Sequence, residues 1–352
     1  MKRTTYLLAA LTILLLAGML WVRAEAAATK AGGGPTTLGS TLPAAGAASS
    51  PVEPNTHDPV LIKEGDTYYV FFTGGNVAAL HSTDLIHWTR AANLLPRTPA
   101  WVATELPGVR GLWAPDIAFY KGKYLLFYAA SSFGSRNSAI GLATNKTLDP
   151  GSKDYQWEDG GMVIRSTQTD NYNAIDPNFV VDEKGQPWLA FGSFWSGIKL
   201  RKLTDEGKPD PLDPTLYALA ARAGGSTAIE APFIIHEGRY YYLFVSWDRC
   251  CAGLNSTYRI IAGRAEKITG PYVDKDNVAM AQGGGTQLLA GDGKRIIGPG
   301  GQGLFKDGDR WLMVHHFYDG NTPNGTSRLQ VRPVTFDERG WPVVGKAMNS
   351  PE

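Results

Sequence analysis

The chain has 352 residues, of which 43% are hydrophobic and 19% are charged, and its formal net charge is +1. This balance is that of an ordinary soluble protein, and it excludes nucleic acid as an expected partner. Forty-one glycines, 22 prolines, 10 tryptophans, 15 tyrosines and 13 phenylalanines favour many short strands joined by tight turns. We therefore expect an all-β protein.

The first 50 residues have the form of an export signal followed by a linker. Lys2 and Arg3 precede an apolar run over residues 6–22 and a small-residue stretch around 24–26, which predicts a signal peptide over residues 1–26. Because the run is long for a signal core, an uncleaved membrane anchor is the alternative. Residues 27–50 are small and nearly uncharged, as in a linker. We expect a secreted protein, extracellular or periplasmic, whose folded domain spans residues 51–352.

One sequence theme occurs five times after residue 51. Each copy has a proline beside an acid or glycine, an apolar strand, a glycine-containing turn and an aromatic-rich strand. The prolines, which are separated by 56, 62, 55 and 67 residues, are Pro59, Pro115, Pro177, Pro232 and Pro299. Each interval has room for about four strands of ordinary length.

Further strands are expected outside each hairpin, at residues 81–88, 138–144, 197–203, 256–265 and 327–336. Five four-stranded sheets arranged radially predict a five-bladed β-propeller. Two stacked sandwiches would also explain the alternating strands, but not five copies of one hairpin. The one helix expected is a turn or two near residues 214–221.

Acids occupy the strand heads of four repeats, namely Asp58, Asp116, Asp176 and Glu230. The fifth repeat has Gly-Pro-Gly-Gly at 298–301 instead, which leaves room. If each first strand lines the axis of a ring, these carboxylates converge at one end of the central channel. The alternative is a turn role, since Asp-Pro also occurs in polar loops at residues 149, 210 and 213. Asp116 follows its proline, so binding of substrate and binding of a backbone group both stay open.

Clustered carboxylates with aromatic side chains near the strand ends indicate sugar chemistry. Glycoside hydrolysis needs one protonated carboxyl group and one ionised carboxylate. Flat rings can cover a sugar face, although each ring could equally be core packing. The candidates are Trp113, Phe133, Trp195 and Trp247, of which Trp113, directly before the second strand head, is the best.

The histidine and cysteine pairs leave alternatives open. His315 and His316 are adjacent in an aromatic strand, so they point to opposite faces. One could hold a metal ion or water, and a hydrogen-bonded core histidine is the alternative, since no other ligand is at metal-site spacing. His57 is expected to be a local hydrogen-bonding residue. Cys250 and Cys251 either form a disulfide between neighbours or are two buried thiols.

The chain resembles glycoside hydrolase family 43, and within it the endo-1,5-α-L-arabinanases, from about residue 54 to the C-terminus. The ordered motifs that carry this resemblance are HDP (57–59), GLWAPDI (111–117), SAIGLAT (138–144), NAIDPNF (173–179), FGSFWSGI (191–198), IEAPFI (229–234), CCAGLNSTYRIIAGRAEKITGPYVD (250–274), GGGTQLL (283–289), GPGGQG (298–303) and HHFYDG (315–320). The five-bladed propeller of that family agrees with the repeat count.

The resemblance implies hydrolysis of α-1,5-linked arabinofuranosyl residues in arabinan with inversion. Asp58 corresponds to the general base, Glu230 to the general acid, and Asp176 to the residue that orients the acid and raises its pKa. Inversion requires the base and acid to be roughly 6.5–9.5 Å apart.

The resemblance also implies ligands around these acids. Trp113 and Phe133 match positions of the arabinose-binding cleft, while Asp116 is our further substrate-binding candidate. A calcium ion is implied in the central channel, held by His316, with His315 as the second choice, and by waters. Ala252 and Asn255 depart from the family pattern at the cleft edge.

Two other functions remain as alternatives. An exo-acting arabinofuranosidase or β-xylosidase would use the same three acids, and a non-catalytic carbohydrate-binding propeller would have lost one. No sequence for an accessory sandwich follows the fifth repeat before Glu352, so we expect endo action. We also expect a monomer without stable membrane association, unless the N-terminal segment stays uncleaved.

Overall fold

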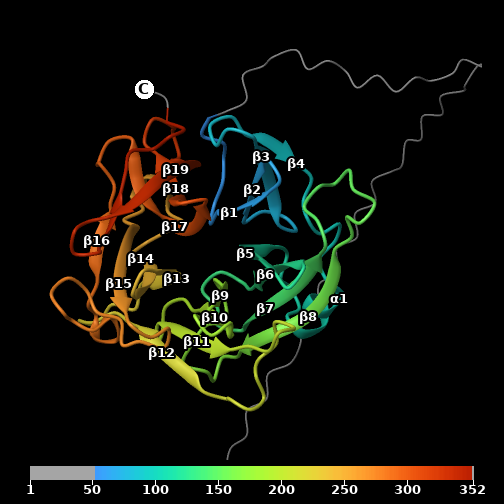
Figure 1. Cartoon of the computed structure of the whole chain (residues 1–352), viewed down its shortest axis with the longest axis horizontal. Coiled ribbons are helices and arrows are strands. Elements are labelled where there is room, and N and C mark those ends of the chain that lie inside the picture. Colours follow the sequence, from blue (N-terminus) through green and yellow to red (C-terminus); the bar gives the residue numbers. More distant parts are fainter. Residues whose placement is uncertain (1–51, 351–352) are drawn as a thin grey trace, which may run out of the picture. The chain divides into compact units, whose positions relative to one another are not determined.

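This computed structural model describes residues 52–350 of the chain. These residues form five antiparallel sheets of four strands each (Figure 1). The predicted signal peptide, anchor and linker lie outside the described residues, so they stay predictions. Among the helical segments of residues 52–350, none has the length and apolar character of a membrane span.

Each sheet consists of four strands that are consecutive in the sequence. Blade 1 contains β1 (Val60–Glu64), β2 (Thr67–Phe72), β3 (Ala78–Ser82) and β4 (Thr89–Ala91). Blade 2 contains β5 (Leu112–Tyr120), β6 (Lys123–Ala130), β7 (Ser138–Asn145) and β8 (Glu158–Ser166). Blade 3 contains β9 (Asn178–Val181), β10 (Pro187–Phe191), β11 (Ile198–Lys202) and β12 (Leu216–Ala220).

The remaining two blades follow the same plan. Blade 4 contains β13 (Ile229–Glu237), β14 (Tyr240–Trp247), β15 (Arg259–Ala265) and β16 (Thr286–Leu289). Blade 5 contains β17 (Ile296–Asp307), β18 (Arg310–Asp319), β19 (Thr326–Phe336) and β20 (Pro342–Val344). The helical turns among the described residues are α1 (Ala100–Glu105), η1 (Gly253–Asn255) and η2 (Met280–Gln282).

The first strand of every blade lies at the centre of a ring (Figure 1). These five strands contact one another in cyclic order, β1 with β5, then β9, β13 and β17, and β17 again with β1. Apolar residues of neighbouring sheets fill the space between the blades; for example, Phe127 of β6 stacks on Phe179 of β9, with ring centroids 5.6 Å apart. The prediction of an all-β, five-bladed propeller is confirmed.

Two local predictions were wrong. Residues 214–221 contain the edge strand β12 instead of a helix, because pairing with β11 and burial of Leu219 and Ala220 outweigh local helix propensity. The third strand of blade 1 was expected at 81–88 but ends at Ser82. There the Ser82 hydroxyl and the Asp84 carboxylate accept backbone N–H groups of residues 84–87, which folds the chain into a turn.

The chain enters each innermost strand through the same unusual backbone conformation. The residue before every repeat proline has a positive φ: 49° at Asp58, 39° at Ala114, 55° at Asp176, 51° at Ala231 and 51° at Gly298. A proline disfavours the right-handed helical region for the residue before it. For a residue other than glycine, the left-handed region costs on the order of 1–3 kcal/mol. The ring therefore holds four such residues in place at its centre.

The ring closes without exchange of a strand between its first and last blades. Instead, the segment before β1 runs along blade 5, where the Leu329 N–H donates to the Pro54 carbonyl at 3.0 Å. Glu53 accepts from Gln330 at 3.1 Å and pairs with Arg295. The same segment places His57 and Asp58 next to β18 of the last blade.

Candidate active site

The Asp58 carboxylate is held by two donors on the same oxygen. Thr73 donates its hydroxyl proton to Oδ2 at 2.7 Å, and His57 Nδ1 lies 2.9 Å from the same atom. The Thr73 hydroxyl itself accepts the Ala114 N–H at 2.8 Å, so its proton points at Asp58. The other oxygen, Oδ1, is the one nearest Gly301. Asp58 thus has one anchored oxygen and one that faces the glycines of β17.

The Glu230 carboxyl group, in β13, is almost fully buried between two hydroxyl groups. Ser193 donates to Oε2 and Tyr258 donates to Oε1, both at 2.8 Å. Ser193 follows β10 of blade 3, and Tyr258 precedes β15 of blade 4. Glu230 is therefore oriented by side chains from two adjacent blades.

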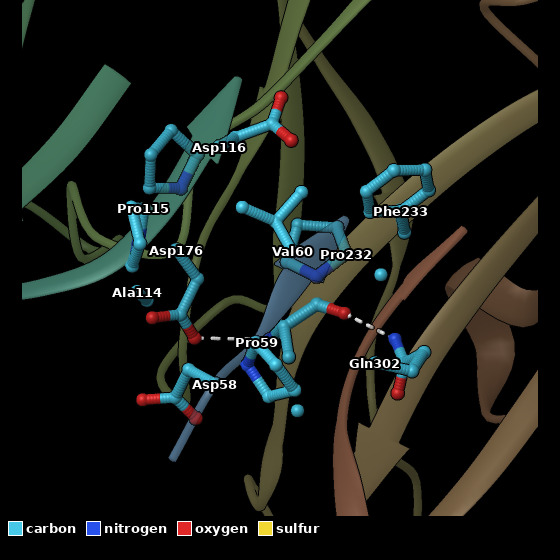
Figure 2. Close-up of a pocket in the computed structure, with 14 residues that line it drawn as sticks. Asp58, Pro59, Val60, Ala114, Pro115, Asp116, Asp176, Pro232, Phe233 and Gln302 are labelled. Atoms are coloured by element: carbon cyan, nitrogen blue, oxygen red, sulfur yellow. Dashed lines mark hydrogen bonds between the residues drawn. The ribbon is translucent and has the colours of Figure 1, made fainter. Parts of the chain in front are cut away.

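Asp176 is linked to the same acid through the backbone. Its Oδ2 accepts the N–H of Ala231, the residue after Glu230, at 3.0 Å. Figure 2 shows the Asp58 and Asp176 carboxylates near one end of a central cavity lined by the strand heads of all five blades. The structure brings together three of the four acids that the sequence analysis singled out.

The pKa shifts of the three carboxyl groups differ in direction: two are raised and one is lowered. Burial raises the pKa of Asp176 well above its usual range, and the charges of Glu230 and Asp58 add to the increase. Burial also raises the pKa of Glu230, against the Ser193 and Tyr258 hydroxyls and with help from the Asp58 charge. Burial alone would raise the pKa of Asp58, but His57, then His316 and Thr73, lower it below its ordinary value. Such divergence is typical of an acid and base pair.

Asp116, the fourth acid, also lines this cavity, but its carboxylate binds a different group. Its carboxylate points away from the other two acids drawn in Figure 2. Its Oδ2 accepts the Phe179 N–H at 2.5 Å and the Asn178 amide at 3.3 Å. Burial raises the pKa of Asp116 to about 7. Asp116 thus joins blade 2 to blade 3 by binding a backbone group, one of the two roles that the sequence left open.

The two aromatic residues of the predicted cleft lie at the same end of blade 2. Trp113 is half-buried directly before Ala114, and it pairs with Ala129 near the end of β6. Phe133 is in the loop after β6 and is 83% exposed. An exposed ring beside the strand heads is free to contact a ligand, whereas Trp247 is covered by Arg222 at 4.0 Å and Arg259 at 5.5 Å. Trp195 lies 5.5 Å from Arg136.

The two adjacent histidines of β18 differ in what their ring nitrogens contact. His315 uses both, because Nδ1 lies 3.0 Å from the His316 carbonyl and Nε2 accepts from Arg332 at 3.1 Å. Burial, then Arg332, lowers the pKa of His315 to about 3. His316 Nδ1 accepts the Asp58 N–H at 3.1 Å, but its buried Nε2 has no partner among the described residues. His316 is therefore the histidine that can bind a further group.

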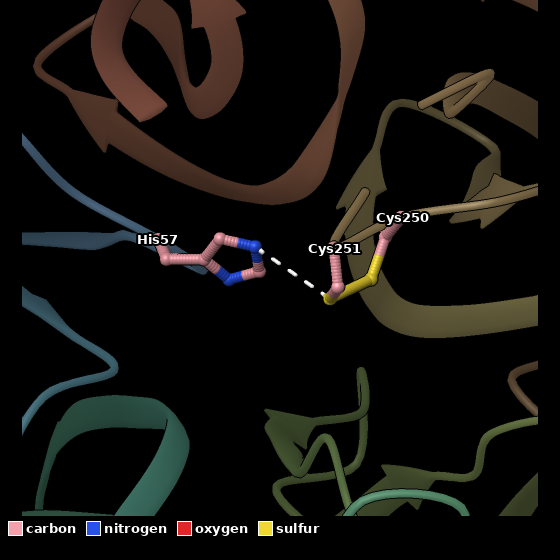
Figure 3. Close-up of side chains that lie close together, drawn as sticks. All are labelled: His57, Cys250 and Cys251. Atoms are coloured by element: carbon pink, nitrogen blue, oxygen red, sulfur yellow. Dashed lines mark hydrogen bonds between the residues drawn. A yellow bond between two sulfur atoms is a disulfide. The ribbon is translucent and has the colours of Figure 1, made fainter. Parts of the chain in front are cut away.

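Cys250 and Cys251 form a disulfide at the edge of this site (Figure 3). The Cys251 sulfur lies 3.8 Å from His57 Nε2, and the Cys251 N–H donates to the Tyr318 hydroxyl at 2.7 Å. Because both thiols are consumed by the disulfide, this cluster of cysteines and histidine is unsuited to a thiolate-bound metal.

Sequence reasoning missed the polar residues that hold the acids, namely Thr73, Ser193, Tyr258, Gln302 and Tyr318. Each of them acts on a residue of another blade or on a distant part of its own blade, so sequence spacing gives no signal for the contact. Gln302 shows the pattern: it donates to the Ala231 carbonyl at 2.6 Å and accepts from Ser246 at 2.8 Å (Figure 2).

The chain is similar to several known proteins. Residues 48–342 match the family described as glycosyl hydrolases family 43. The chain is 45% identical over 291 residues to the extracellular endo-α-(1→5)-L-arabinanase 1 of Bacillus subtilis, covering 81% of this chain and 86% of that protein. It is 42% identical over 303 residues to the extracellular exo-α-(1→5)-L-arabinofuranosidase ArbA of Cellvibrio japonicus, covering 82% and 86%.

Solved structures show the same likeness. An exo-1,5-α-L-arabinanase from a bovine ruminal metagenomic library superposes with a TM-score of 0.80 at 46% identity, covering 84% of this chain and 98% of that chain. A Cellvibrio cellulosa α-L-arabinanase complexed with arabinohexaose superposes with a TM-score of 0.79 at 39% identity, covering 83% and 96%.

The close approach of β17 to Asp58 gives a testable prediction. Gly301 has φ +59°, and a Cβ there would lie 2.7 Å from Asp58 Oδ1 and 2.8 Å from the His316 ring. We expect Gly301→Ala to lower the free energy of unfolding by about 1–3 kcal/mol more than Gly308→Ala, because of this overlap. Gly308 is the matched control, since it has φ +62° with nothing within 4 Å. Denaturant unfolding measures both losses, and equal losses would contradict the prediction.

Proposed function

The chain belongs to glycosyl hydrolases family 43, and from this premise we propose that it hydrolyses the α-1,5-L-arabinofuranosidic bonds of arabinan with inversion, acting within the polysaccharide chain. The observation that carries the proposal is the group of three carboxyl groups at the heads of the innermost strands of blades 1, 3 and 4, with the pKa of Asp58 lowered and those of Asp176 and Glu230 raised. The presence of all three acids favours an enzyme over a propeller that only binds carbohydrate.

The proposed reaction uses one ionised and one protonated carboxyl group. Asp58 takes a proton from a water molecule through Oδ1, since its Oδ2 is held by Thr73 and His57. The water oxygen bonds to the anomeric carbon from the side opposite the glycosidic oxygen, and the bond to that oxygen breaks. Glu230 gives its proton to the departing oxygen, so that the sugar is released with inverted configuration.

We assign Asp176 the role of orienting the acid and raising its pKa. Its carboxylate accepts the N–H of Ala231 and so fixes the backbone next to Glu230. Two like charges close together disfavour ionisation of both groups, which keeps a proton available on the acid. Trp113 and Phe133 are the proposed cleft surfaces for the arabinose rings, because both lie at the strand-head end of blade 2.

A second candidate activity is exo-acting hydrolysis of the same bonds. The similarity to an exo-acting arabinofuranosidase, 42% identity, is close to that to an endo-acting arabinanase, 45% identity, and this supports keeping both. We propose an exported enzyme, because both of these relatives are named extracellular. A monomeric state stays a prediction.

We also propose that a calcium ion binds at His316. The family resemblance implies such an ion, and the buried Nε2 of His316 offers a nitrogen that no described residue contacts. The ring proton is on Nε2 while Nδ1 accepts the Asp58 N–H. Direct binding through Nε2 would require that proton to move to Nδ1 and the contact with the Asp58 N–H to be given up. One imidazole completed by waters suits a hard cation, which would supply positive charge near the carboxylates.

The first prediction from the proposed function concerns the base and the acid. We expect Asp58→Ala to lower kcat on linear arabinan by at least about a hundredfold, because the water loses its proton acceptor. Glu230→Ala should lose as much on arabinan but much less on aryl arabinofuranosides, whose leaving groups need little protonation. Reducing-sugar release measures the first, and nitrophenol release the second.

Asp205→Ala, which removes an exposed acid paired with Lys121, is the control and should match the wild-type protein. A well-folded wild-type protein that releases no sugar from arabinan would overturn the proposed function. The early products separate the two activities: mixed oligomers support endo action, and one dominant short product supports exo action.

A second prediction concerns pH. The raised pKa of Glu230 keeps the acid protonated into a higher pH range, so activity is lost as pH rises through that pKa. Asp176→Asn removes the second ionisable group of this pair and should lower the pKa of Glu230. We therefore expect the alkaline limb of the kcat profile to move to lower pH, by on the order of one unit. Asp205→Asn is the control. An alkaline limb that stays in place in Asp176→Asn would refute the role of Asp176.

A third prediction concerns calcium. We expect isothermal titration calorimetry of the chelator-treated protein to detect calcium binding that His316→Ala abolishes, because His316 supplies the one protein ligand. His87→Ala is the control, since the His87 ring is exposed and pairs with Asp84 instead. Calcium binding of unchanged affinity in His316→Ala would contradict the proposed site.

A further inference from the structure

We propose that Lys199 is a positioning residue for the acid, because its ammonium group holds the turn that carries Ser193 onto Glu230. The inference rests on the proposed function, in which Glu230 gives its proton to the departing oxygen. Lys199 lies in β11 of blade 3 and is buried, with 7% of its surface exposed. No motif of the sequence marked it as a site residue.

The buried charge of Lys199 is not explained by an ion pair. Burial lowers the pKa of its ammonium group, and among the described residues no carboxylate offsets this effect. Nζ instead donates to the Ser196 carbonyl at 2.8 Å. Removal of an ammonium group from water is costly unless the group is paired and hydrogen-bonded. The bond to this backbone carbonyl is therefore the contact by which Lys199 acts on the rest of blade 3.

The Ser196 carbonyl belongs to a turn with a strained backbone. Phe194 and Trp195 lie in the left-handed region, with φ of 55° and 43°, and the Gly197 N–H donates to the Phe194 carbonyl at 2.7 Å. For residues other than glycine, this conformation costs on the order of 1–3 kcal/mol each and persists where the surroundings enforce it. The turn thus depends on contacts from outside, and Lys199 supplies one of them.

The same turn is joined to the acid by two hydrogen bonds. The Ser193 hydroxyl is bonded to Glu230 Oε2 at 2.8 Å, and the Phe194 N–H donates to the Ile229 carbonyl at 2.8 Å. Two neighbouring residues of blade 3 therefore hold two neighbouring residues at the head of blade 4. Because Ser193 directly precedes the left-handed Phe194, a change in the turn moves the Ser193 hydroxyl relative to the Glu230 carboxyl group.

Loss of the Lys199 bond should act on protonation of the departing oxygen. The turn keeps a second anchor, since the Ser196 N–H donates to the Asn171 carbonyl at 2.9 Å, so it is loosened instead of lost. Glu230 then keeps Tyr258 but is no longer fixed by Ser193. A displaced acid slows the release of a poor leaving group much more than that of a good one, because a good one needs little protonation. A general loss of stability has no such dependence on the leaving group.

The test compares Lys199→Met with the wild-type protein on two substrates. Methionine keeps an apolar side chain of similar length without the ammonium group. We expect kcat on linear arabinan to fall by at least about fivefold, because a small displacement of a catalytic group is costly. We expect kcat on a nitrophenyl arabinofuranoside to fall by less than about twofold. Lys202→Met is the matched control on the same strand, since Lys202 pairs with Asp210 at 3.0 Å, and both of its rates should stay at the wild-type value.

A double-mutant cycle shows whether Lys199 acts through Ser193. Ser193→Ala removes the hydroxyl group, so in that background Lys199→Met should lower kcat on arabinan by less than about twofold. Independent effects would give the same loss in both backgrounds. Thermal unfolding checks that each variant is folded. Lys199→Gln, whose side chain ends one atom short of the Nζ position, takes the place of Lys199→Met in both comparisons where the latter is unfolded.

Three results with an active wild-type protein would overturn this inference alone. These are an unchanged kcat on arabinan, equal losses on the two substrates, or an undiminished loss in the Ser193→Ala background. Failure of the proposed function looks different, because the wild-type protein would then release no sugar from arabinan. That result would overturn both the proposed function and the role of Lys199.

Discussion

The contact between the first and last blades is the interaction on which the active site depends. The ring has no strand shared between its two ends, so side chains and the segment before β1 must hold blade 1 against blade 5. The same contact seats the base: the Asp58 N–H donates to His316, and His57 stacks on the same ring. The contacts that close the ring therefore also position the base.

A second constraint works at each strand head. A left-handed residue before a proline turns the chain sharply into the innermost strand, and Asp58 and Asp176 occupy two of these five positions. Aspartate tolerates this conformation better than most residues. In blade 5, glycine takes the position, and Gly300 and Gly301 leave the space that the Tyr258 ring and the Asp58 carboxylate fill. The same backbone turn thus carries an acid in blades 1 and 3, whereas in blade 5 it carries a glycine that leaves space for neighbouring side chains.

The architecture could be predicted from the sequence because each blade has its own local pattern of strands and turns. Five proline-headed hairpins can be recognised from spacing alone, and the acids at their heads follow from the same alignment. Residues 214–221 were misread because their strand exists through pairing with β11, which local preference does not contain. The partners of the acids, such as Ser193 and Tyr258 on Glu230, were missed for a similar reason, since they come from different blades and meet only in the folded ring.

The base and the acid are supported by different parts of the ring, and this has a mechanistic consequence. Glu230 is held by Ser193 of blade 3 and Tyr258 of blade 4, whereas Asp58 is held by Thr73 of blade 1 and His316 of blade 5. Inversion requires a fixed gap between the two carboxyl groups that admits one water molecule. The residues that hold Glu230 and those that hold Asp58 are different. The distance between the two carboxyl groups is therefore set by how the blades close into a ring. Gln302, which binds both Ala231 and Ser246 from blade 5, ties the acid side to the blade that seats the base.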